Sequence, residues 1–186
     1  MFVPEAPLPV NYGAIGTVIG HEITHGFDNK GAQYDEAGNV RSWWDRSTWA
    51  TFMKKMQCFV MQYGKQIEPT IKKNVNGHLT VQENIADNGG LRAAYEAYKM
   101  RCSREECTAL PQMSSFTPEQ LFFVAFANIW CQNLRSSVIG QIMESSSHAL
   151  WRFRTNVPLQ NFPPFAKAFQ CPVGSLMNPR EKCRVW

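Results

Sequence analysis

Several features of well-known protein classes are missing from this sequence. Its 186 residues carry 19 Lys and Arg against 15 Asp and Glu, a net charge of +4 with no basic run, so nothing favours nucleic-acid binding. The longest apolar stretch, residues 121–131, contains Asn128 and is too short to cross a bilayer. Residues 1–10 hold three prolines, Glu5 and no Lys or Arg, so they do not resemble a signal peptide.

Repeats and low-complexity segments are also absent, and only 18% of the residues are charged while 44% are hydrophobic. That composition is typical of a folded globular chain and excludes an intrinsically disordered one. A chain of this length fits one domain, which buries about two-thirds of the surface that its unfolded form exposes. We therefore expect a single folded unit.

The six cysteines include no CxxC pair. An even, scattered set is typical of a disulfide framework, which requires an oxidising compartment; six buried, reduced thiols in a cytosolic protein are the alternative. A framework implies export, yet the sequence shows no export signal. We therefore expect this chain to be the C-terminal piece of a longer secreted or membrane-anchored protein. The cysteines are Cys58, Cys102, Cys107, Cys131, Cys171 and Cys183.

The spacing of apolar residues predicts a mainly α-helical fold with a short hairpin. Residues 12–27 form an apolar segment whose small residues let a buried helix approach its neighbours closely, and Gly26 is a plausible helix end. Over residues 49–67, apolar side chains recur every three or four positions, which predicts an amphipathic helix. Asn76-Gly77 predicts a turn.

Capping patterns predict where two further helices begin. Thr80-Val81-Gln82-Glu83 has the form of a capping box, so we place a helix start at Thr80. Thr117 precedes Pro118 and lies three residues before Gln120, which predicts another start there. The apolar run that follows, residues 121–130, is nearly continuous and therefore central. Shorter helices are expected at 137–144 and 164–169, followed by an irregular tail from Pro172.

The motif His21-Glu22-Ile23-Thr24-His25 points to metal chemistry. Positions i and i+4 share one face of a helix, so both imidazoles can bind one Zn²⁺. Glu22 lies close enough to take a proton from a zinc-bound water as that water attacks a carbonyl. The alternative is a pair of core histidines four residues apart. A buried His pair and Glu without a metal would, however, leave polar groups to satisfy.

A peptidase zinc site needs a third protein ligand. Position 31, where one zinc peptidase class has a histidine, is Gly31, and the candidates are Glu83, His78 and His148.

Glu83 and Asp87 share one helical face, so one carboxylate can bind metal while the other accepts the free ring N–H of a ligand histidine. Asp28 is placed to do the same for the second histidine. The alternatives are a capping role for Glu83 and a solvated position for Asp87.

Three segments of this sequence, in this order, resemble the neprilysin and endothelin-converting-enzyme family of zinc endopeptidases. They are residues 18–28 (VIGHEITHGFD), 83–90 (ENIADNGG) and the tail with Met177-Asn178-Pro179 and Lys182-Cys183-Arg184-Val185-Trp186. The resemblance runs from about Asn11 to Trp186. It implies one zinc ion per chain, bound by His21, His25 and Glu83, with Glu22 as catalytic base and Asp87 and Asp28 orienting the histidines.

The resemblance also implies roles for His148 and Arg154, because family members carry a His followed six positions later by an Arg. His148 would donate a hydrogen bond to the oxyanion of the tetrahedral intermediate, and Arg154 would bind a substrate carbonyl. The intervening Ala149-Leu150 departs from the usual Ser-Pro of the family. For His148 the alternative is a partly exposed histidine at a helix end.

Other family features would lie outside this chain: an edge strand that pairs with the substrate backbone, a large N-terminal lobe and a membrane anchor. The resemblance implies a Cys58–Cys183 disulfide, and the close spacing of Cys102 and Cys107 suggests a local bridge. Cys131 and Cys171 would then pair with cysteines of the absent N-terminal part.

We therefore predict a zincin-type, mainly α catalytic subdomain that lacks the family's upstream strands and N-terminal lobe. Residues 1–10 would be an irregular segment and residues 11–186 the C-terminal portion of the catalytic domain. The parent protein would cleave oligopeptides on the extracellular side, by attack of a zinc-bound water that Glu22 activates. The alternative is a catalytically incompetent fragment, or a truncated zinc-binding or interaction domain.

Overall fold

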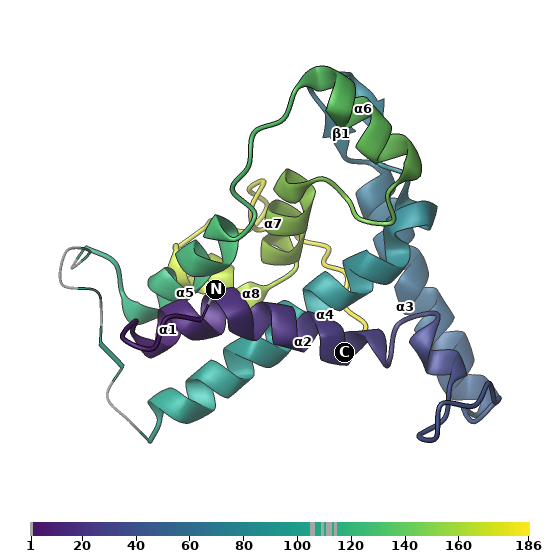
Figure 1. Ribbon diagram of the computed structural model, residues 1–186, viewed down its shortest axis with the longest axis horizontal. Coiled ribbons are helices and arrows are strands. Elements are labelled where there is room, and N and C mark those ends of the chain that lie inside the picture. The colour runs from purple at the N-terminus through teal and green to yellow at the C-terminus, as the bar shows by residue number, and fades with distance from the viewer. Residues whose placement is uncertain (1, 105–106, 109, 111–112, 114) are drawn as a thin grey trace.

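The computed structural model describes residues 2–104, 107–108, 110, 113 and 115–186. Its regular elements are almost all helices, as the apolar spacing predicted (Figure 1). None of the helices in the described ranges combines the length and the apolar character that a bilayer span requires.

The first helical stretch holds the HExxH motif. It consists of α1 (Leu8–Asn11), a π-helical turn (Tyr12–Gly16) and α2 (Thr17–His25), which follow one another without a break. Gly26 caps the end of α2, as expected. The stretch begins at Leu8, inside the segment that we predicted to be irregular, because Pro9 sits in its first turn, where a missing amide costs nothing.

The next elements are a short 3₁₀ turn (Gly31–Gln33) and α3 (Arg46–Gly64). Asp45 caps α3 by accepting hydrogen bonds from the amides of Ser47 and Thr48. The expected hairpin follows, with β1 (Ile67–Glu68) antiparallel to β2 (Lys73–Asn74) and Ile67 opposite Asn74. Ile67, which we had expected in the helix, therefore belongs to a strand.

Helix α4 (Gly77–Cys102) carries the second motif and begins three residues earlier than predicted. Its cap is Asn76, whose side chain accepts from the Leu79 amide at 3.0 Å. The Thr80 hydroxyl instead donates to the Asn76 carbonyl at 3.0 Å. The predicted capping box at Thr80 is therefore wrong, and Glu83 is free for another role.

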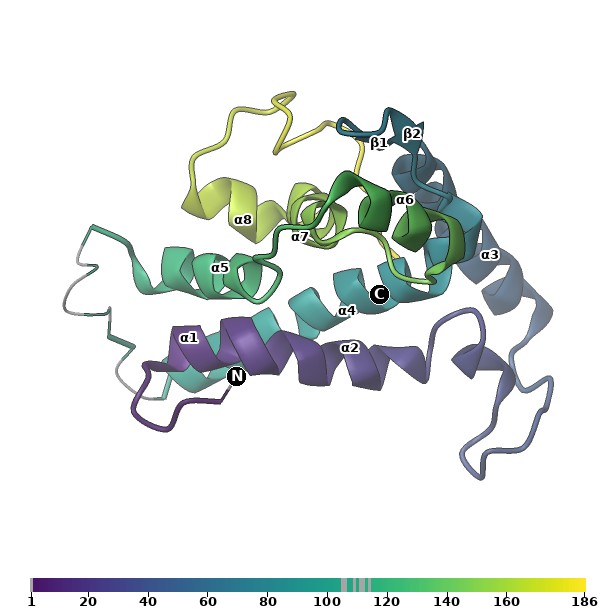
Figure 2. The same ribbon diagram turned by 45° about the horizontal axis from the view of Figure 1, so that its top comes forward.

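The remaining helices are α5 (Pro118–Asn128), α6 (Ser136–Ser145), α7 (Trp151–Gln160) and α8 (Pro163–Ala168). Both halves of the predicted capping box at the start of α5 are present, between Thr117 and Gln120. Helix α7 was not predicted from the sequence. Figure 2 shows α7 above α4 and α8 above α5, with α6 next to the hairpin.

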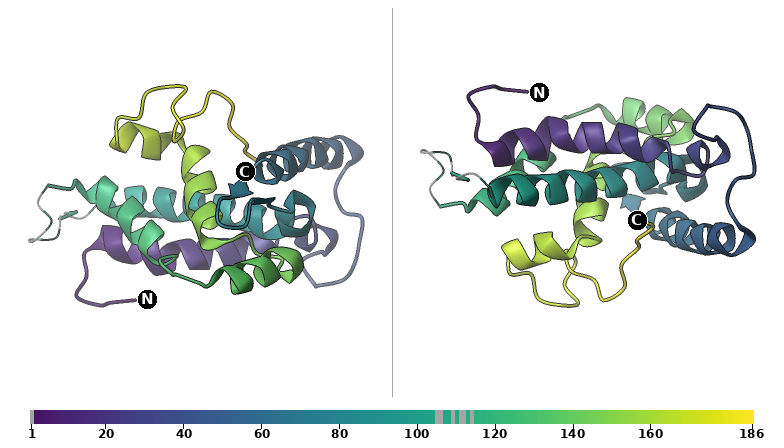
Figure 3. Two further views of the ribbon diagram at one scale, coloured as in Figure 1. Left: turned by 90° about the horizontal axis from the view of Figure 1, so that it is seen from above. Right: turned by 90° about the horizontal axis from the view of Figure 1, so that it is seen from below.

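Helices α2 and α4 lie side by side and run in opposite directions (Figure 3). Two glycines allow this close packing. A Cβ on Gly20 would meet the Gly90 carbonyl oxygen at 2.7 Å, and one on Gly90 would collide with the His21 backbone. The close approach places the two sequence motifs against each other.

Two apolar clusters hold the helices together. One lies between α3, the start of α4, α7 and the C-terminal tail, and includes Phe52, Phe59, Tyr63, Ile85 and Val157. The other joins the second half of α4 to α5 and α8, and includes Leu91, Tyr98, Phe122, Phe126 and Phe162. Helix α4, which carries the second motif, contributes residues to both clusters, and α2, which carries the first motif, packs against α4.

Both predicted disulfides are present. Cys58–Cys183 ties α3 to the C-terminal tail, and Cys102–Cys107 closes a local loop after α4. Cys131 and Cys171 are free; Cys131 is exposed and Cys171 is half-buried.

Candidate metal centre

Three side chains of the two motifs converge between α2 and α4. His21 Nε2 lies 3.3 Å from Glu83 Oε2, and His25 Nε2 lies 3.4 Å from the same oxygen. The three potential ligand atoms all lie within 4.8 Å of one another. The helical spacing brings the histidines to one face, and the packing of Gly20 on Gly90 brings Glu83 to them.

A second carboxylate holds each imidazole from behind. His21 Nδ1 lies 2.8 Å from Asp87 Oδ1, and His25 Nδ1 lies 2.6 Å from Asp28 Oδ2. Asp28 is fully buried, and its other oxygen accepts from the amides of Lys30 and Gly31. A carboxylate accepts hydrogen bonds, so each Nδ1 donates to its aspartate and the Nε2 atom of each ring is the one that faces Glu83.

This donor set fits a zinc ion. Two imidazole nitrogens and one carboxylate form the His₂Glu set of catalytic zinc sites, which leaves a fourth position open. Glu83 Oε2 is buried without a hydrogen-bond partner, although three imidazole nitrogens lie near it. A buried ionised oxygen is costly unless a positive charge balances it, and either a protonated imidazole or a metal ion can supply that charge here.

The local charges also favour a cation here. Burial opposes ionisation of Glu83, but His148, His21 and His25 outweigh it and hold the Glu83 pKa well below its usual range. Burial likewise opposes the charged form of His21, but Asp87 and Glu83 outweigh it and raise the His21 pKa to about 9. The metal-free site therefore retains a proton where a metal ion would replace it.

The structure narrows the three candidates for the third ligand. Glu83 joins the two histidines, whereas His78 is exposed in the first turn of α4. His148 lies beside the group: its Nε2 is 3.0 Å from Glu83 Oε2, and its side chain is 44% exposed. Ser147 Oγ, which sequence reasoning did not single out, lies 3.5 Å from His148 Nδ1.

Arg154 contacts Asp87, the hydrogen-bond partner of His21, and not His21, His25 or Glu83 themselves. Its Nε and one terminal nitrogen donate to the two Asp87 oxygens, each at 2.8 Å. Its guanidinium carbon also lies 3.9 Å from the centroid of the Trp130 ring. Trp130 had no role in the sequence-based prediction, since nothing in its local spacing connects the turn after α5 to Arg154.

Glu22 is exposed on α2, next to His21. The structure therefore brings together His21, His25, Glu83, Asp87, Asp28, His148 and Arg154, and leaves Glu22 open to solvent beside them.

Residues 1–185 match the model of peptidase family M13. The chain belongs to this family. It is 48% identical over 183 residues to Neprilysin-21 of Caenorhabditis elegans, covering 97% of this chain and 24% of that protein. It is 46% identical to an endothelin-converting enzyme homolog of Locusta migratoria, again over 97% of this chain and 24% of the relative. These matches confirm the predicted family.

Solved M13-like structures share the fold. The zinc metalloprotease Zmp1 of Mycobacterium tuberculosis, in complex with an inhibitor, superposes with a TM-score of 0.92 at 32% identity, over 100% of this chain and 29% of Zmp1. A Haemonchus galactose-containing glycoprotein complex gives a TM-score of 0.93 at 36% identity, over 100% and 31%. The chain thus spans about a quarter of the length of the curated relatives that it matches.

Proposed function

We propose that this chain carries the zinc site of an M13 endopeptidase that cleaves oligopeptides. One observation carries the proposal: Glu83 Oε2 is buried, lacks a hydrogen bond and faces two Nε2 atoms whose rings are fixed by aspartates. His21, His25 and Glu83 would hold one zinc ion. Bound there, zinc supplies a Lewis acid that activates a water molecule and polarises the scissile carbonyl.

Glu22 is the general base in this proposal. It follows His21 directly, its side chain projects about 100° further around α2, and it is exposed. It accepts the proton of the attacking water and passes it to the leaving amine. A positioned general base contributes about 10²- to 10⁴-fold in rate.

His148 and Arg154 stabilise the reacting carbonyl. The His148 Nε2, which contacts Glu83 at 3.0 Å, donates to the oxygen that becomes negative during attack. Asp87 holds two of the three guanidinium nitrogens of Arg154, which leaves the third to donate to a substrate carbonyl. Donors aimed at developing charge in this way contribute roughly 3–4 kcal/mol each.

The cysteines and the family indicate in which compartment the parent protein acts and which partners it has. Two disulfides favour an oxidising compartment, so we place the parent protein on the extracellular side of a membrane or in secretions. Cys131 and Cys171 would pair with cysteines elsewhere in a longer protein. Peptides are the expected substrates, and nucleic acid is not an expected partner.

A second candidate function applies to these 186 residues taken alone: zinc binding with little turnover. The sheet found in the described residues has only the two short strands β1 and β2, and neither carries a site residue. Ile19 and Ile23 on α2, with Phe27 just after its end, form an apolar stripe that is 47% to 63% exposed. Without a strand to align the peptide, catalysis loses positioning worth several kcal/mol, and the stripe favours aggregation.

A peptide-cleavage assay separates the two functions. We expect little chelator-sensitive cleavage by the isolated chain, and full cleavage once an upstream segment from an M13 relative is joined to it. In that longer protein, Glu22→Gln keeps the zinc and loses at least about 10²-fold in turnover, whereas Glu36→Gln, exposed in the loop after α2, is the neutral control. Full turnover by Glu22→Gln would contradict the general-base role.

A further inference from the structure

A buried amide at the end of α7 uses every hydrogen bond that its side chain can make. Asn161 is 4% exposed. Its Oδ1 accepts from Gln62 Nε2 at 2.8 Å and from the Cys183 amide at 3.0 Å. Its Nδ2 donates to Gln62 Oε1 at 2.8 Å and to Asn88 Oδ1 at 2.9 Å. A buried polar group that is fully satisfied fixes one arrangement of its neighbours.

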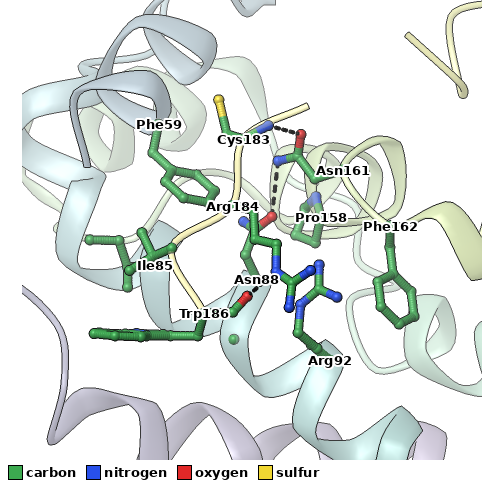
Figure 4. A pocket seen from close by; sticks show the side chains of 12 residues that line it. Phe59, Ile85, Asn88, Arg92, Pro158, Asn161, Phe162, Cys183, Arg184 and Trp186 are labelled. Carbon is green, nitrogen blue, oxygen red and sulfur yellow. Dashed lines mark hydrogen bonds between the residues drawn. The ribbon is translucent and has the colours of Figure 1, made fainter. Parts of the chain in front are cut away.

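The four bonds join parts of the chain that are far apart in sequence. Gln62 belongs to α3, Asn88 to α4, and Cys183 to the tail that the disulfide anchors to α3. Figure 4 shows Asn161 between the Cys183 backbone and Asn88, above the middle of α4. Asn88 in turn donates to the Tyr63 hydroxyl at 3.1 Å and the Asn84 carbonyl at 2.8 Å.

Helices α4 and α7 are thus connected at two places. One is the Asn161–Asn88 hydrogen bond, and the other is the Arg154 fork on Asp87 at the metal centre. Asp87 and Asn88 are consecutive on α4, and Arg154 and Asn161 are seven positions apart, about two turns of α7. Asp87 Oδ1 is shared by Arg154 and His21, so a shift of α7 acts on the ligand.

We infer that Asn161 is a positioning residue of the metal centre. It holds α7 against α4 so that Arg154 and His21 can share the Asp87 carboxylate. The inference rests on the proposed zinc function, since the property it controls is metal affinity. Catalytic and metal-binding groups must be held to within about 0.5 Å of their working geometry, and supporting contacts provide that accuracy.

The test measures zinc affinity in the 186-residue chain by competition with a chelator. Removing a direct hydrogen-bond partner of a metal ligand costs about 10- to 100-fold in affinity. Asn161 acts on Asp87 only indirectly, through Asn88 and the position of α7, so we expect Asn161→Ala to weaken zinc binding by about three- to tenfold. Asn156→Ala, exposed on the same helix, is the matched control.

A loss of stability alone must not be mistaken for this effect. Phe126→Leu opens a cavity in the core on α5, a helix that makes no hydrogen bond to Asn161. It should lower the melting temperature yet leave the zinc affinity of the folded protein within about twofold of wild type. Asn161→Ala should lower both the melting temperature and the zinc affinity. Replacing a residue that only stabilises the fold would lower the melting temperature alone.

Asn88→Ala provides an independent arm, because it removes the contact to α4 and leaves the Gln62 and Cys183 bonds of Asn161 in place. It should weaken zinc binding to a similar degree, and the double variant should lose less than the sum of the two. If Asn161→Ala does not fold, Asn88→Ala decides the question. If the wild-type chain binds zinc and the folded variants bind it with the same affinity, the inference is wrong. A wild-type chain that binds no zinc overturns the proposed function instead.

Discussion

Replacing Asp87 with Asn separates the two tasks of this buried carboxylate. Asp87 accepts hydrogen bonds from His21 Nδ1 and from two nitrogens of Arg154, all at 2.8 Å. The side chain of Asn has the same shape but one acceptor oxygen and no charge. With the amide oxygen at the Oδ1 position, the His21 bond and one Arg154 bond remain, while the amide NH₂ faces the second Arg154 donor.

Two magnitudes follow for Asp87→Asn. One lost charge-assisted hydrogen bond to a nearly buried arginine, with the remaining two weakened, lowers the free energy of unfolding of the metal-free protein by about 2–4 kcal/mol. Zinc affinity falls by about 10- to 100-fold, because His21 loses the ionised partner that makes it a stronger ligand. Urea unfolding measures the first quantity and chelator competition measures the second.

Glu96→Gln is the matched control, since Glu96 is an exposed carboxylate on the same helix. It should leave zinc affinity unchanged. If Asp87→Asn loses stability as expected but binds zinc within twofold of wild type, Asp87 serves only as the partner of Arg154. The proposed orientation of His21 would then be wrong.

Three further predictions concern pH, thiols and helix packing. The His21 pKa of about 9 lies above its ordinary value of 6.5, so this proton stabilises the metal-free fold below pH 6.5 and its contribution is lost as pH rises through 9. Zinc must displace this His21 proton, so the apparent zinc affinity should rise by up to about tenfold per pH unit as pH rises toward 9 and then level off. A zinc affinity that does not change with pH would contradict the assignment of His21 as a ligand. Thiol titration of the oxidised chain should find Cys131 and Cys171 reactive, and peptide mapping that finds them bonded to each other would show a self-contained disulfide set. Gly20→Ala should destabilise the fold by about 1–3 kcal/mol through its collision with Gly90 and weaken zinc binding, whereas Gly64→Ala, with no neighbour to collide with, should do neither.

Local sequence signals predicted the parts of the fold that depend on local contacts. The α3 periodicity, the α5 capping box and the end of α2 at Gly26 are all present. The start of α4 was misplaced because Asn76 and Thr80 both suit a cap, and only the fold shows that Thr80 bonds back to Asn76. Helix α7 was missed because polar residues interrupt its apolar face and Pro158 lies inside it.

The candidate site likewise contains residues that the sequence pattern predicted and residues whose roles depend on tertiary contacts. The spacing of His21 and His25 places them on one face before any tertiary contact is known. Helical spacing also named Glu83, Asp87 and Asp28 as candidates, and the family resemblance selected Glu83 as the third ligand. Trp130 and Asn161 have no such signal, because their roles arise from contacts across the fold.

For Trp130 the contact is the stacking of Arg154 on its ring, and for Asn161 it is a set of bonds to three separate segments. A single sequence contains no local pattern for contacts of this kind.

The metal content of the purified chain tests the central claim most directly. We predict one zinc ion per wild-type chain by elemental analysis after removal of loosely bound metal, and loss of tightly bound zinc in Glu83→Val, since two histidines alone leave the site short of ligands. His78→Ala, which changes an exposed histidine on the same helix, should retain the full amount. A Glu83→Val chain that still holds one tightly bound zinc ion would contradict the assignment of His21, His25 and Glu83 as the metal centre.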